Sequence, residues 1–520
     1  MSGDRVDQGP TLATGLGWFA ALLAFVVGAR VIRDNSLLTH LATGELIIDT
    51  GSVPTVDPYS RTAPGESWTV QSWLASVLYA GVDRAAGPTG LRLLHGAVAA
   101  AVAGCLWHLT APAKQVVTRL ALTMIPIVIG AELWSPRPFM FGLLAAVVLL
   151  LIVETRLRPA LMIPLFWMWA NVHGSFPIGL AMLAALAVGR FLDLRIERRE
   201  HEVAGLGAVG RQTGGFDART PFDAARYVAG RVPLKTRWVN APVEVRHTAA
   251  ALVGVLLAAV NPIGPRLLWF PLHLLGRREA LSGVVEWQPP SFDSVADLLF
   301  LGLIPLVAVA ARFGAPWRSL LPSLCFLAAG FLAIRNIAMA SIVVVVVVAP
   351  SFRDRVGAED GLFSGLVPRL LTRGAALGIA AVAVVVASGP GFDLDAYPVD
   401  EVALLEQRGL TPGADTGLVH REAVGNYLAY RYGPDAGVFI DDRFDYYPVE
   451  LTDDHLALLE GGDYRAVLDR WGGDVVLWED ETLLADWLAL AEGWTVVHDR
   501  DGWVIACRID SPAHERCIGD

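Results

Sequence analysis

The chain has 520 residues, of which 54% are hydrophobic and only 18% charged, and its mean hydropathy is +0.48. These values exclude a disordered chain and argue against an ordinary soluble enzyme. The net charge of −11 is unevenly divided: segment 391–520 holds 28 Asp and Glu against 9 Lys and Arg, a net of −19, and the rest has a net of +8. Because a strongly acidic segment repels phosphates, nucleic acid is excluded as a partner.

The apolar residues are gathered in runs. Crossing a bilayer takes about 20 apolar residues, and runs near that length predict membrane helices. Eleven such runs lie at 13–32, 88–110, 117–134, 138–155, 159–172, 175–193, 247–262, 296–312, 317–334, 337–350 and 370–389. The first is interpreted as a retained helix, since no signal-peptide cleavage site stands out. We therefore expect an α-helical polytopic membrane domain over 1–390.

The basic residues predict the orientation of these helices. With a cytoplasmic N-terminus, Lys and Arg concentrate in alternate loops, as the positive-inside rule requires. The largest basic loop, 194–246, is Gly-rich and is predicted to be a cytosolic insert. The same alternation places 33–87, 263–295 and 391–520 outside the cytoplasm. We expect a multi-pass protein of the cell membrane, with the lipid bilayer as its first partner.

Loop 33–87 carries two amphipathic stripes. Leu37, Leu38, Leu41 and Ile48 can share one helical face, and a second stripe of i, i+4 apolar residues begins at Trp73. A turn-rich stretch separates the two. They predict two helices that lie in the membrane interface.

The acidic segment 391–520 alternates strand-like and helix-like pieces. The runs GVFIDD, DVVLWE, WTVVHD and WVIACR predict strands, and REAVGNYLAYRY, TDDHLALLEG, DYRAVLDRW and ETLLADWLALAEG predict helices. This alternation indicates a small extracytoplasmic α/β domain. Outside the cell, Cys507 and Cys517 could pair as a disulfide, but connectivity cannot be read from sequence and both states stay open.

Seven ionisable residues lie in links that the predicted topology places outside the cytoplasm. Such groups are costly at the edge of a membrane and usually face a cavity or a partner. The seven are Asp34, His40, Asp57, Arg137, His173, Glu286 and Arg335. Because they share one side of the membrane, we expect them to line a single cavity.

Five of these residues also have a purely structural interpretation, which stays open here. Asp34 can cap a helix that begins near Ser36. Asp57 before Pro58 fits an Asx-turn. Arg137 can snorkel at the interface, His173 can bond within a turn, and Glu286 can anchor the interface.

An acid, nearby arginines and an apolar route from the bilayer suit the transfer of a sugar from a lipid phosphate. A carboxylate can take the proton of an attacking hydroxyl. Arginines, which are always charged, can neutralise the departing phosphate. The sequence contains neither GxGxxG nor GxxxxGK[ST], so the usual nucleotide motifs are absent.

The ordered motifs resemble a branch of the GT-C-fold glycosyltransferases, and the resemblance covers nearly the whole chain. Its elements in the first loop are Asp34, His40, Leu41, Gly44, Gly51, Pro54, Asp57, Pro58, Ser60, Trp68, Trp73 and Leu74. Further shared pieces are RPFMF, WANVHGSF, NPIGPRLLWFP, VEWQPPSF and VFIDDRFDYYP. Ser36 departs from the branch pattern, which has a second acid there, and Leu38 and Thr39 replace two tryptophans.

The resemblance implies that Asp34 is the catalytic base or a metal ligand. On this view Arg137 and Arg335 bind the lipid phosphate. The remaining candidates, His40, Asp57, His173 and Glu286, position sugar or acceptor. Loss of the second carboxylate at Ser36 argues against a divalent metal, and we expect no other cofactor.

We therefore expect a membrane glycosyltransferase that moves a sugar from a polyprenyl-phosphate donor to an extracytoplasmic glycan, lipid or protein acceptor. One alternative is a non-catalytic membrane scaffold that recruits a partner through its acidic tail. Another is a lipid-linked glycan transporter, which predicts mid-membrane charges and internal repeats that we do not find. The tail residues Asp441, Asp442, Arg443 and Asp445 are interpreted as a salt-bridge cluster at a strand end.

Overall fold

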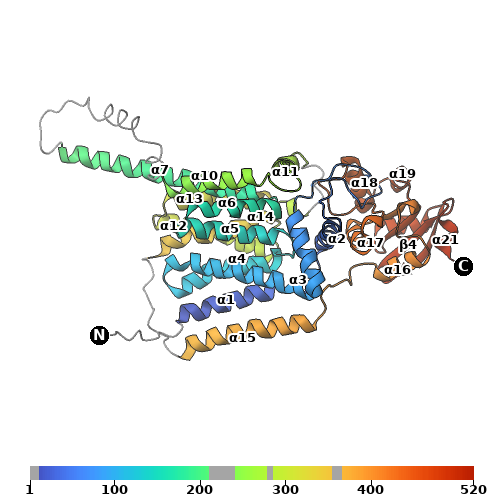
Figure 1. Ribbon diagram of the computed structural model, residues 1–520, viewed down its shortest axis with the longest axis horizontal. Helices are drawn as coiled ribbons and strands as arrows, with labels where there is room; N and C mark the ends of the chain where they lie inside the picture. The colour runs from blue at the N-terminus through green and yellow to red at the C-terminus, as the bar shows by residue number, and fades with distance from the viewer. Residues whose placement is uncertain (1–10, 210–240, 278–284, 354–365, 520) are drawn as a thin grey trace, which may run out of the picture.

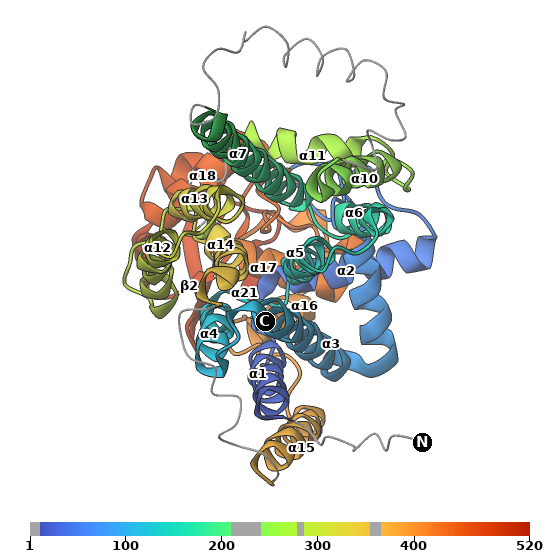
Figure 2. The ribbon, with the colours of Figure 1, turned by 90° about the vertical axis from the view of Figure 1, so that its left-hand side faces the viewer.

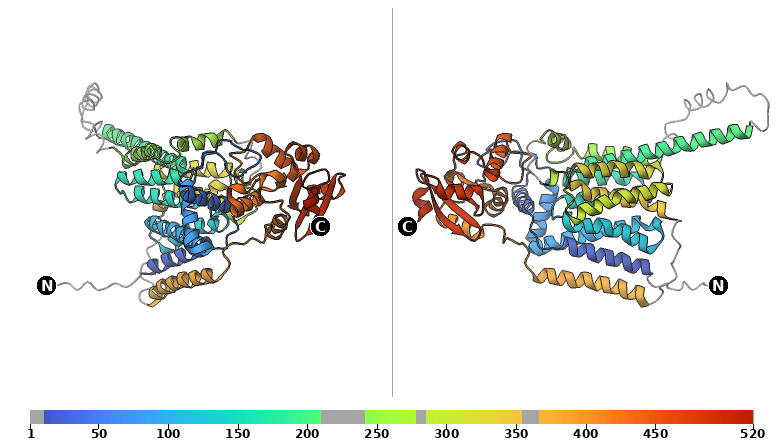
Figure 3. Two further views of the ribbon diagram at one scale, coloured as in Figure 1. Left: turned by 45° about the vertical axis from the view of Figure 1, so that its right-hand side comes forward. Right: turned by 180° about the vertical axis from the view of Figure 1, so that it is seen from behind.

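A bundle of long helices stands beside a smaller C-terminal domain in the computed structural model, which describes residues 11–209, 241–277, 285–353 and 366–519 (Figure 1). The bundle helices lie roughly side by side (Figure 3). They are α1 (Leu12–Gly28), α3 (Trp73–Leu109), α4 (Val116–Leu133), α5 (Phe139–Glu154), α6 (Met162–Val172), α7 (Phe176–Val209), α10 (Val243–Leu257), α12 (Val295–Arg312), α13 (Trp317–Leu332), α14 (Arg335–Val348) and α15 (Leu366–Ser388).

All eleven predicted apolar runs are helical. Among the described residues, six helical stretches are long and apolar enough to cross a membrane: 73–113, 116–133, 176–200, 295–312, 335–352 and 366–388. Four further apolar helices are shorter, at 12–28, 139–154, 159–172 and 317–332. The chain is therefore a largely helical protein with several helices able to span a membrane.

The core of the bundle is built around α14, whose valine run Val343–Val348 is fully buried among the other helices. Looking along the bundle, α14 and α5 lie inside and α15 lies at the periphery (Figure 2). In α15 only Pro368, Ala375 and Val386 are buried. An apolar helix with so little protein contact suits a lipid environment.

Two features of the bundle differ from the sequence-based boundaries. Helix α3 begins at Trp73, and Gly87 with φ of 60° breaks it just before Pro88, where the predicted run 88–110 starts. Helix α7 continues to Val209 and projects beyond its neighbours (Figure 1). The first part of the predicted insert 194–246 is therefore helical, and residues 210–240 lie outside the described chain.

The C-terminal domain has a four-stranded sheet in the order β1-β2-β4-β3. Strand β1 (Leu418–His420) is parallel to β2 (Val475–Glu479), whereas β4 (Trp503–Arg508) is antiparallel to both β2 and β3 (Trp494–Arg500). The helices of this domain are α16 (Val399–Gln407), α17 (Glu422–Tyr432), α18 (Val449–Glu460), α19 (Tyr464–Arg470), α20 (Leu483–Leu490) and α21 (His514–Ile518). Cys507 and Cys517 form a disulfide that ties β4 to α21.

Three of the four predicted strands are confirmed, and GVFIDD was wrong. That segment is extended but joins no sheet: Val438 pairs only with the first loop, where its N–H donates to Tyr59 O over 2.9 Å. Its apolar side chains, including Phe439 and Ile440, are nonetheless buried. An apolar run indicates that a segment is buried, but not which segment it pairs with. The pattern therefore could not distinguish a strand from a buried loop.

The first loop is packed into the C-terminal domain. Helix α2 (Asn35–Thr50) forms where predicted, ends at Gly51 with φ of 67°, and buries Leu37, Leu38 and Leu41. Leu38 shares a core with the tail residue Leu428. The stripe expected to lie in the membrane interface thus faces protein. Leu37 and Leu41 pack with Ala75 and Tyr79 of α3. On this same face a Cβ at Gly44 would lie 2.0 Å from Ser76 O, so α2 and α3 require glycine at this crossing.

Candidate functional site at the domain junction

Six of the seven residues selected from sequence gather where one end of the bundle meets the C-terminal domain. They come from separate links: before α2, in α2, between α4 and α5, between α6 and α7, before α12, and at the start of α14. A tail residue, Asp442, joins them. We call this group the junction site, and its members are Asp34, His40, Arg137, His173, Glu286, Arg335 and Asp442.

Arg137 connects two acids of the junction site. Its Nε donates to Asp34 Oδ2 over 2.6 Å, and its Nη1 donates to Glu286 Oε1. The Asp34 side chain is only 7% exposed, whereas that of Glu286 is 41% exposed. Asp34 also caps α2, because its Oδ1 accepts the Ser36 N–H over 3.0 Å. The capping interpretation of Asp34 is confirmed, and Arg137 is an ion-paired residue.

Arg335 lies next to this chain of charges without joining it. Its guanidinium sits 4.4 Å from the centre of the Trp287 ring, a cation–π contact. The Ile334 N–H donates to Gln288 O over 3.0 Å, which holds the Trp287 segment against the start of α14. Arg335 interacts electrostatically with Glu286 and Arg137, yet no described carboxylate forms an ion pair with it. Arg335 is therefore a junction-site cation without an ion pair among the described residues.

The two histidines of the junction site are neutral. Burial and the nearby Arg137 lower the pKa of His40 to about 4, and burial with Arg335 lowers that of His173 to about 3. His173 Nδ1 accepts the Ser175 N–H over 3.1 Å, so Nε2 carries the ring proton. His173 thus presents a neutral donor, and the expected turn bond is also present.

Asp442 enters from the tail and reaches the first loop. Its Oδ2 accepts a hydrogen bond from the hydroxyl of Ser36. Burial and the adjacent Asp441 raise the pKa of Asp442 to about 7, although Ser36 and Arg137 oppose the shift. A carboxyl with this pKa exchanges its proton near neutral pH.

Asp57 does not belong to the junction site. Its Oδ1 accepts the Tyr59 N–H over 3.3 Å, which confirms the Asx-turn, and the same oxygen pairs with Arg443 Nη1 over 2.6 Å. Arg443 also pairs with Asp441 over 2.6 Å, and all three side chains are at most 8% exposed. These charges form a buried cluster that joins the first loop to the tail. The predicted salt-bridge cluster is confirmed for Asp441 and Arg443, whereas Asp442 and Asp445 form no ion pair among the described residues and the segment does not end a strand.

A search of the described residues for three or more His, Cys, Asp or Glu side chains arranged to hold a metal ion finds none. Asp34 and Asp442 lie on the two sides of Ser36, and the nearest cation to both is Arg137. Arg137 pairs with Asp34 and with Glu286, so the charges of these two carboxylates are matched by a guanidinium.

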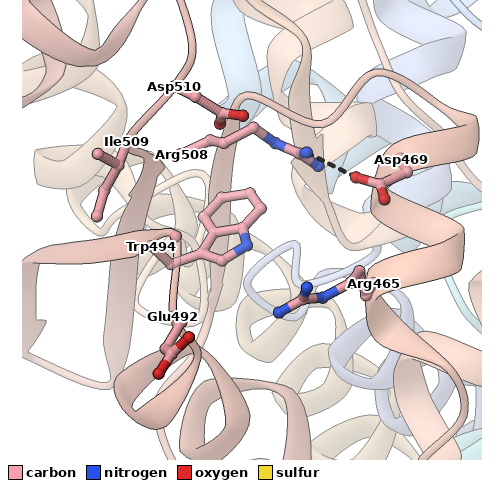
Figure 4. Close-up of a pocket in the computed structure, with 8 residues that line it drawn as sticks. Arg465, Asp469, Glu492, Trp494, Arg508, Ile509 and Asp510 are labelled. Carbon is pink, nitrogen blue, oxygen red and sulfur yellow. Dashed lines mark hydrogen bonds and ion pairs between the residues drawn. The ribbon is translucent and has the colours of Figure 1, made fainter.

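Two surface pockets lie in or beside the C-terminal domain, and neither includes a residue of the junction site. One, of about 470 Å³, lies between the first loop and the tail. The other, of about 410 Å³, lies beside β3 and β4, where Arg508 covers Trp494 and pairs with Asp469 over 2.6 Å (Figure 4). Two charged groups of this second pocket, Arg508 and Asp469, are therefore already paired with each other.

Six of the junction-site residues lie in links that the sequence indicated, but Asp442 was not among the predicted site residues. Adjacent aspartates in FIDDR point to different neighbours, Asp441 to Arg443 and Asp442 to Ser36. Because Ser36 lies 406 residues before Asp442, no local pattern indicated this contact. Comparison of the sequence with protein-family models and with curated proteins gives no match.

Proposed function

We propose that this chain is a membrane glycosyltransferase of GT-C type, with the bundle as a polytopic domain of about eleven membrane helices. It would transfer a sugar from a polyprenyl-phosphate donor to an acceptor outside the cytoplasm. The observation that carries the proposal is the meeting of Arg335, which forms no ion pair among the described residues, with acids and neutral histidines at one end of apolar helices. A donor of this class has an anionic phosphate, a sugar and an apolar tail, and each part has a counterpart here.

The two arginines take different parts in this proposal. Arg137 already binds Asp34 and Glu286, so its charge is matched within the protein. Arg335 has no such partner among the described carboxylates and rests on Trp287. We propose that Arg335 binds the lipid phosphate and that Arg137 holds the two acids in place. Stabilising the charge that develops on the departing phosphate is worth about 3–4 kcal/mol for one well-placed donor.

The neutral histidines suit the sugar. A sugar hydroxyl is an uncharged donor and acceptor, and it is recognised best by groups of the same kind. His173 offers Nε2–H, and His40, whose Nδ1 bonds to Ser76 Oγ over 2.9 Å, is fixed in orientation. Both rings stay uncharged across the physiological range, so they do not compete with Arg335 for the phosphate.

Native mass spectrometry of the full chain in mild detergent tests the proposal. The probes are short-chain polyprenyl-phosphate hexoses and pentoses, and release of polyprenyl phosphate on addition of candidate acceptors reports transfer. We expect the wild type to retain a donor, Arg335→Gln to weaken retention at least tenfold, and Arg335→Lys to restore part of it. Arg84→Gln is the matched control, since Arg84 pairs with Glu45 and Asp49 on the surface.

The outcomes separate the rival functions. Retention of no donor by a folded wild type contradicts the proposal and favours the membrane scaffold. Retention without any release of polyprenyl phosphate, but with movement of the donor across a vesicle bilayer, favours the transporter. The scaffold hypothesis also requires a tail free to recruit a partner, whereas here the tail shares its core with the first loop.

A further inference from the structure

We propose that Asp442, and not Asp34, is the catalytic base of the junction site, so that the C-terminal domain supplies the group that accepts the proton of the attacking hydroxyl. The inference rests on the proposed glycosyl transfer and changes one of its assignments. It follows from how each carboxylate is engaged.

Both oxygens of Asp34 are engaged by neighbouring groups of the protein. Oδ1 accepts the Ser36 N–H over 3.0 Å and Oδ2 accepts Arg137 Nε over 2.6 Å. Its side chain is 7% exposed. A general base must lie within hydrogen-bond reach of the proton that it takes. Asp34 is therefore a positioning residue that fixes α2 and Arg137.

Asp442 is engaged at one oxygen only. Oδ2 accepts from Ser36 Oγ, and Oδ1 has no hydrogen-bond partner among the described residues. The residue is half-buried, and its Oδ1 is not one of the enclosed side-chain oxygens without a hydrogen-bond partner, so it borders accessible space. The Asp442 N–H points to Asn426 Oδ1 over 3.5 Å, which ties the loop to α17. One carboxylate oxygen is thus held and the other is open.

The charged groups around Asp442 come from each neighbouring segment. Asp441 precedes it, Asp34 lies at the start of α2, Arg137 lies in the link after α4, and Tyr397 lies before α16. Arg137 is the only cation that these contacts include, and it pairs with Asp34 and Glu286 rather than with Asp442. Burial beside Asp441 therefore outweighs Arg137 and brings the pKa of Asp442 to about 7. A base with a pKa near the working pH is the most effective in proton transfer.

The proposed step is balanced without a further reactant. The acceptor hydroxyl oxygen forms a bond to the anomeric carbon of the sugar, and its proton passes to Asp442 Oδ1. The bond between the anomeric carbon and the phosphate oxygen breaks, and its electron pair stays on the phosphate, next to Arg335. Asp442 then returns the proton to water, which regenerates the carboxylate.

The decisive experiment compares the pH dependence of kcat/KM for transfer in three variants of the full chain. We expect kcat/KM of the wild type to fall as the pH drops below about 7, which gives an acid limb in the pH profile. Asp442→Asn, which keeps the shape and the Ser36 bond, should lose at least 100-fold in kcat with unchanged donor retention. Asp34→Asn should lose activity but keep the limb. Asp453→Asn, the same change at an exposed position of α18, should match the wild type.

Two outcomes overturn the assignment: full activity in Asp442→Asn, or loss of the limb in Asp34→Asn alone. A second measurement does not depend on substrate. Infrared difference spectroscopy should show a protonated carboxyl that titrates near pH 7 in the wild type and in Asp453→Asn but not in Asp442→Asn. Absence of that signal contradicts the role of Asp442. A folded wild type that retains no donor contradicts the glycosyltransferase itself, so the two failures are distinguishable.

Discussion

The hydroxyl of Ser36 donates a hydrogen bond to the carboxylate of Asp442, across 406 residues of sequence. A small hydroxyl donor at position 36 can therefore satisfy a carboxylate oxygen from the tail. An aspartate at 36 would place a second negative charge against Asp442. The serine instead accommodates a carboxylate that arrives from the other end of the chain.

A pair of substitutions tests this relationship. Ser36→Asp should destabilise the docked tail, because two buried like charges oppose each other, and should lower the melting temperature measured by intrinsic fluorescence. Ser36→Ala removes one hydrogen bond and should cost only about 1 kcal/mol. Adding Asp442→Ser to Ser36→Asp exchanges the two side chains and should recover most of the loss. A double variant no more stable than Ser36→Asp alone would show that Ser36 and Asp442 are not coupled.

The buried charges at Arg443 should be essential for stability. Replacing Arg443 by Leu leaves Asp57 and Asp441, both with side chains of 0% exposure, without their cation. Removal of one partner from a buried ion pair costs about 3–5 kcal/mol. Chemical denaturation followed by tryptophan fluorescence measures this loss.

Arg470 provides the control for that prediction. It pairs with Asp454 over 2.8 Å, but its side chain is 48% exposed. Arg470→Leu should therefore change the free energy of unfolding by less than about 1 kcal/mol. Equal losses in the free energy of unfolding for Arg443→Leu and Arg470→Leu would mean that the buried charges around Arg443 do not join the first loop to the tail.

His420 should make the C-terminal domain sensitive to acid. The ring is fully buried, Nδ1 donates to Arg421 O over 2.9 Å, and Nε2 accepts the Phe439 N–H over 3.0 Å. Burial lowers its pKa to about 3, below the value of 6.5 expected when unfolded. The unfolded state therefore binds the proton first, and stability is complete above pH 6.5 and falls toward pH 3.

At pH 5 this loss should be about 2 kcal/mol. The measurement is the melting temperature at pH 7.5 and pH 5 in the wild type and in His420→Gln, which can still accept from Phe439. The drop should be smaller in the variant. An equal drop in both proteins would remove His420 from the acid response.

The disulfide between Cys507 and Cys517 gives a test of topology as well as stability. It closes a short loop, for which chain entropy predicts about 3 kcal/mol of stabilisation. If the tail lies outside the cytoplasm, both thiols should resist maleimide labelling in intact cells until a reductant is added. The experiment uses a background with Cys105→Ser and Cys325→Ser, since these two thiols are free. Labelling without reductant would place the tail in a reducing compartment.

The helices of the bundle and most of the tail elements could be predicted because each depends on a local pattern. Apolar runs gave eleven helices, and alternation with turn residues gave β2, β3 and β4. Strand β1 has only three residues, Leu418–His420, and is too short to show an alternation of apolar and polar residues. The loop at Val438 is buried without belonging to a sheet, and no local pattern records which segment covers it.

The members of the junction site could be selected from sequence for a different reason. Asp34, Arg137, Glu286 and Arg335 are ionisable groups beside apolar helices, and helices that alternate in direction bring such links to one end. Asp442 could not be placed this way, because its neighbour depends on how an entire domain docks. The prediction that Asp57 belongs to the site was wrong. Its local turn could be predicted from the sequence, but its ion-pair partner Arg443 lies in the tail.

The contact between Ser36 and Asp442 also constrains the order of events during synthesis. At about 5–20 residues per second, the 406 residues between them take roughly 20–80 s to translate. Throughout that interval the bundle can insert while its site still lacks Asp442. An unfinished chain therefore holds the first loop without the proposed base, and the proposed transfer would begin only after the C-terminal domain has emerged and docked.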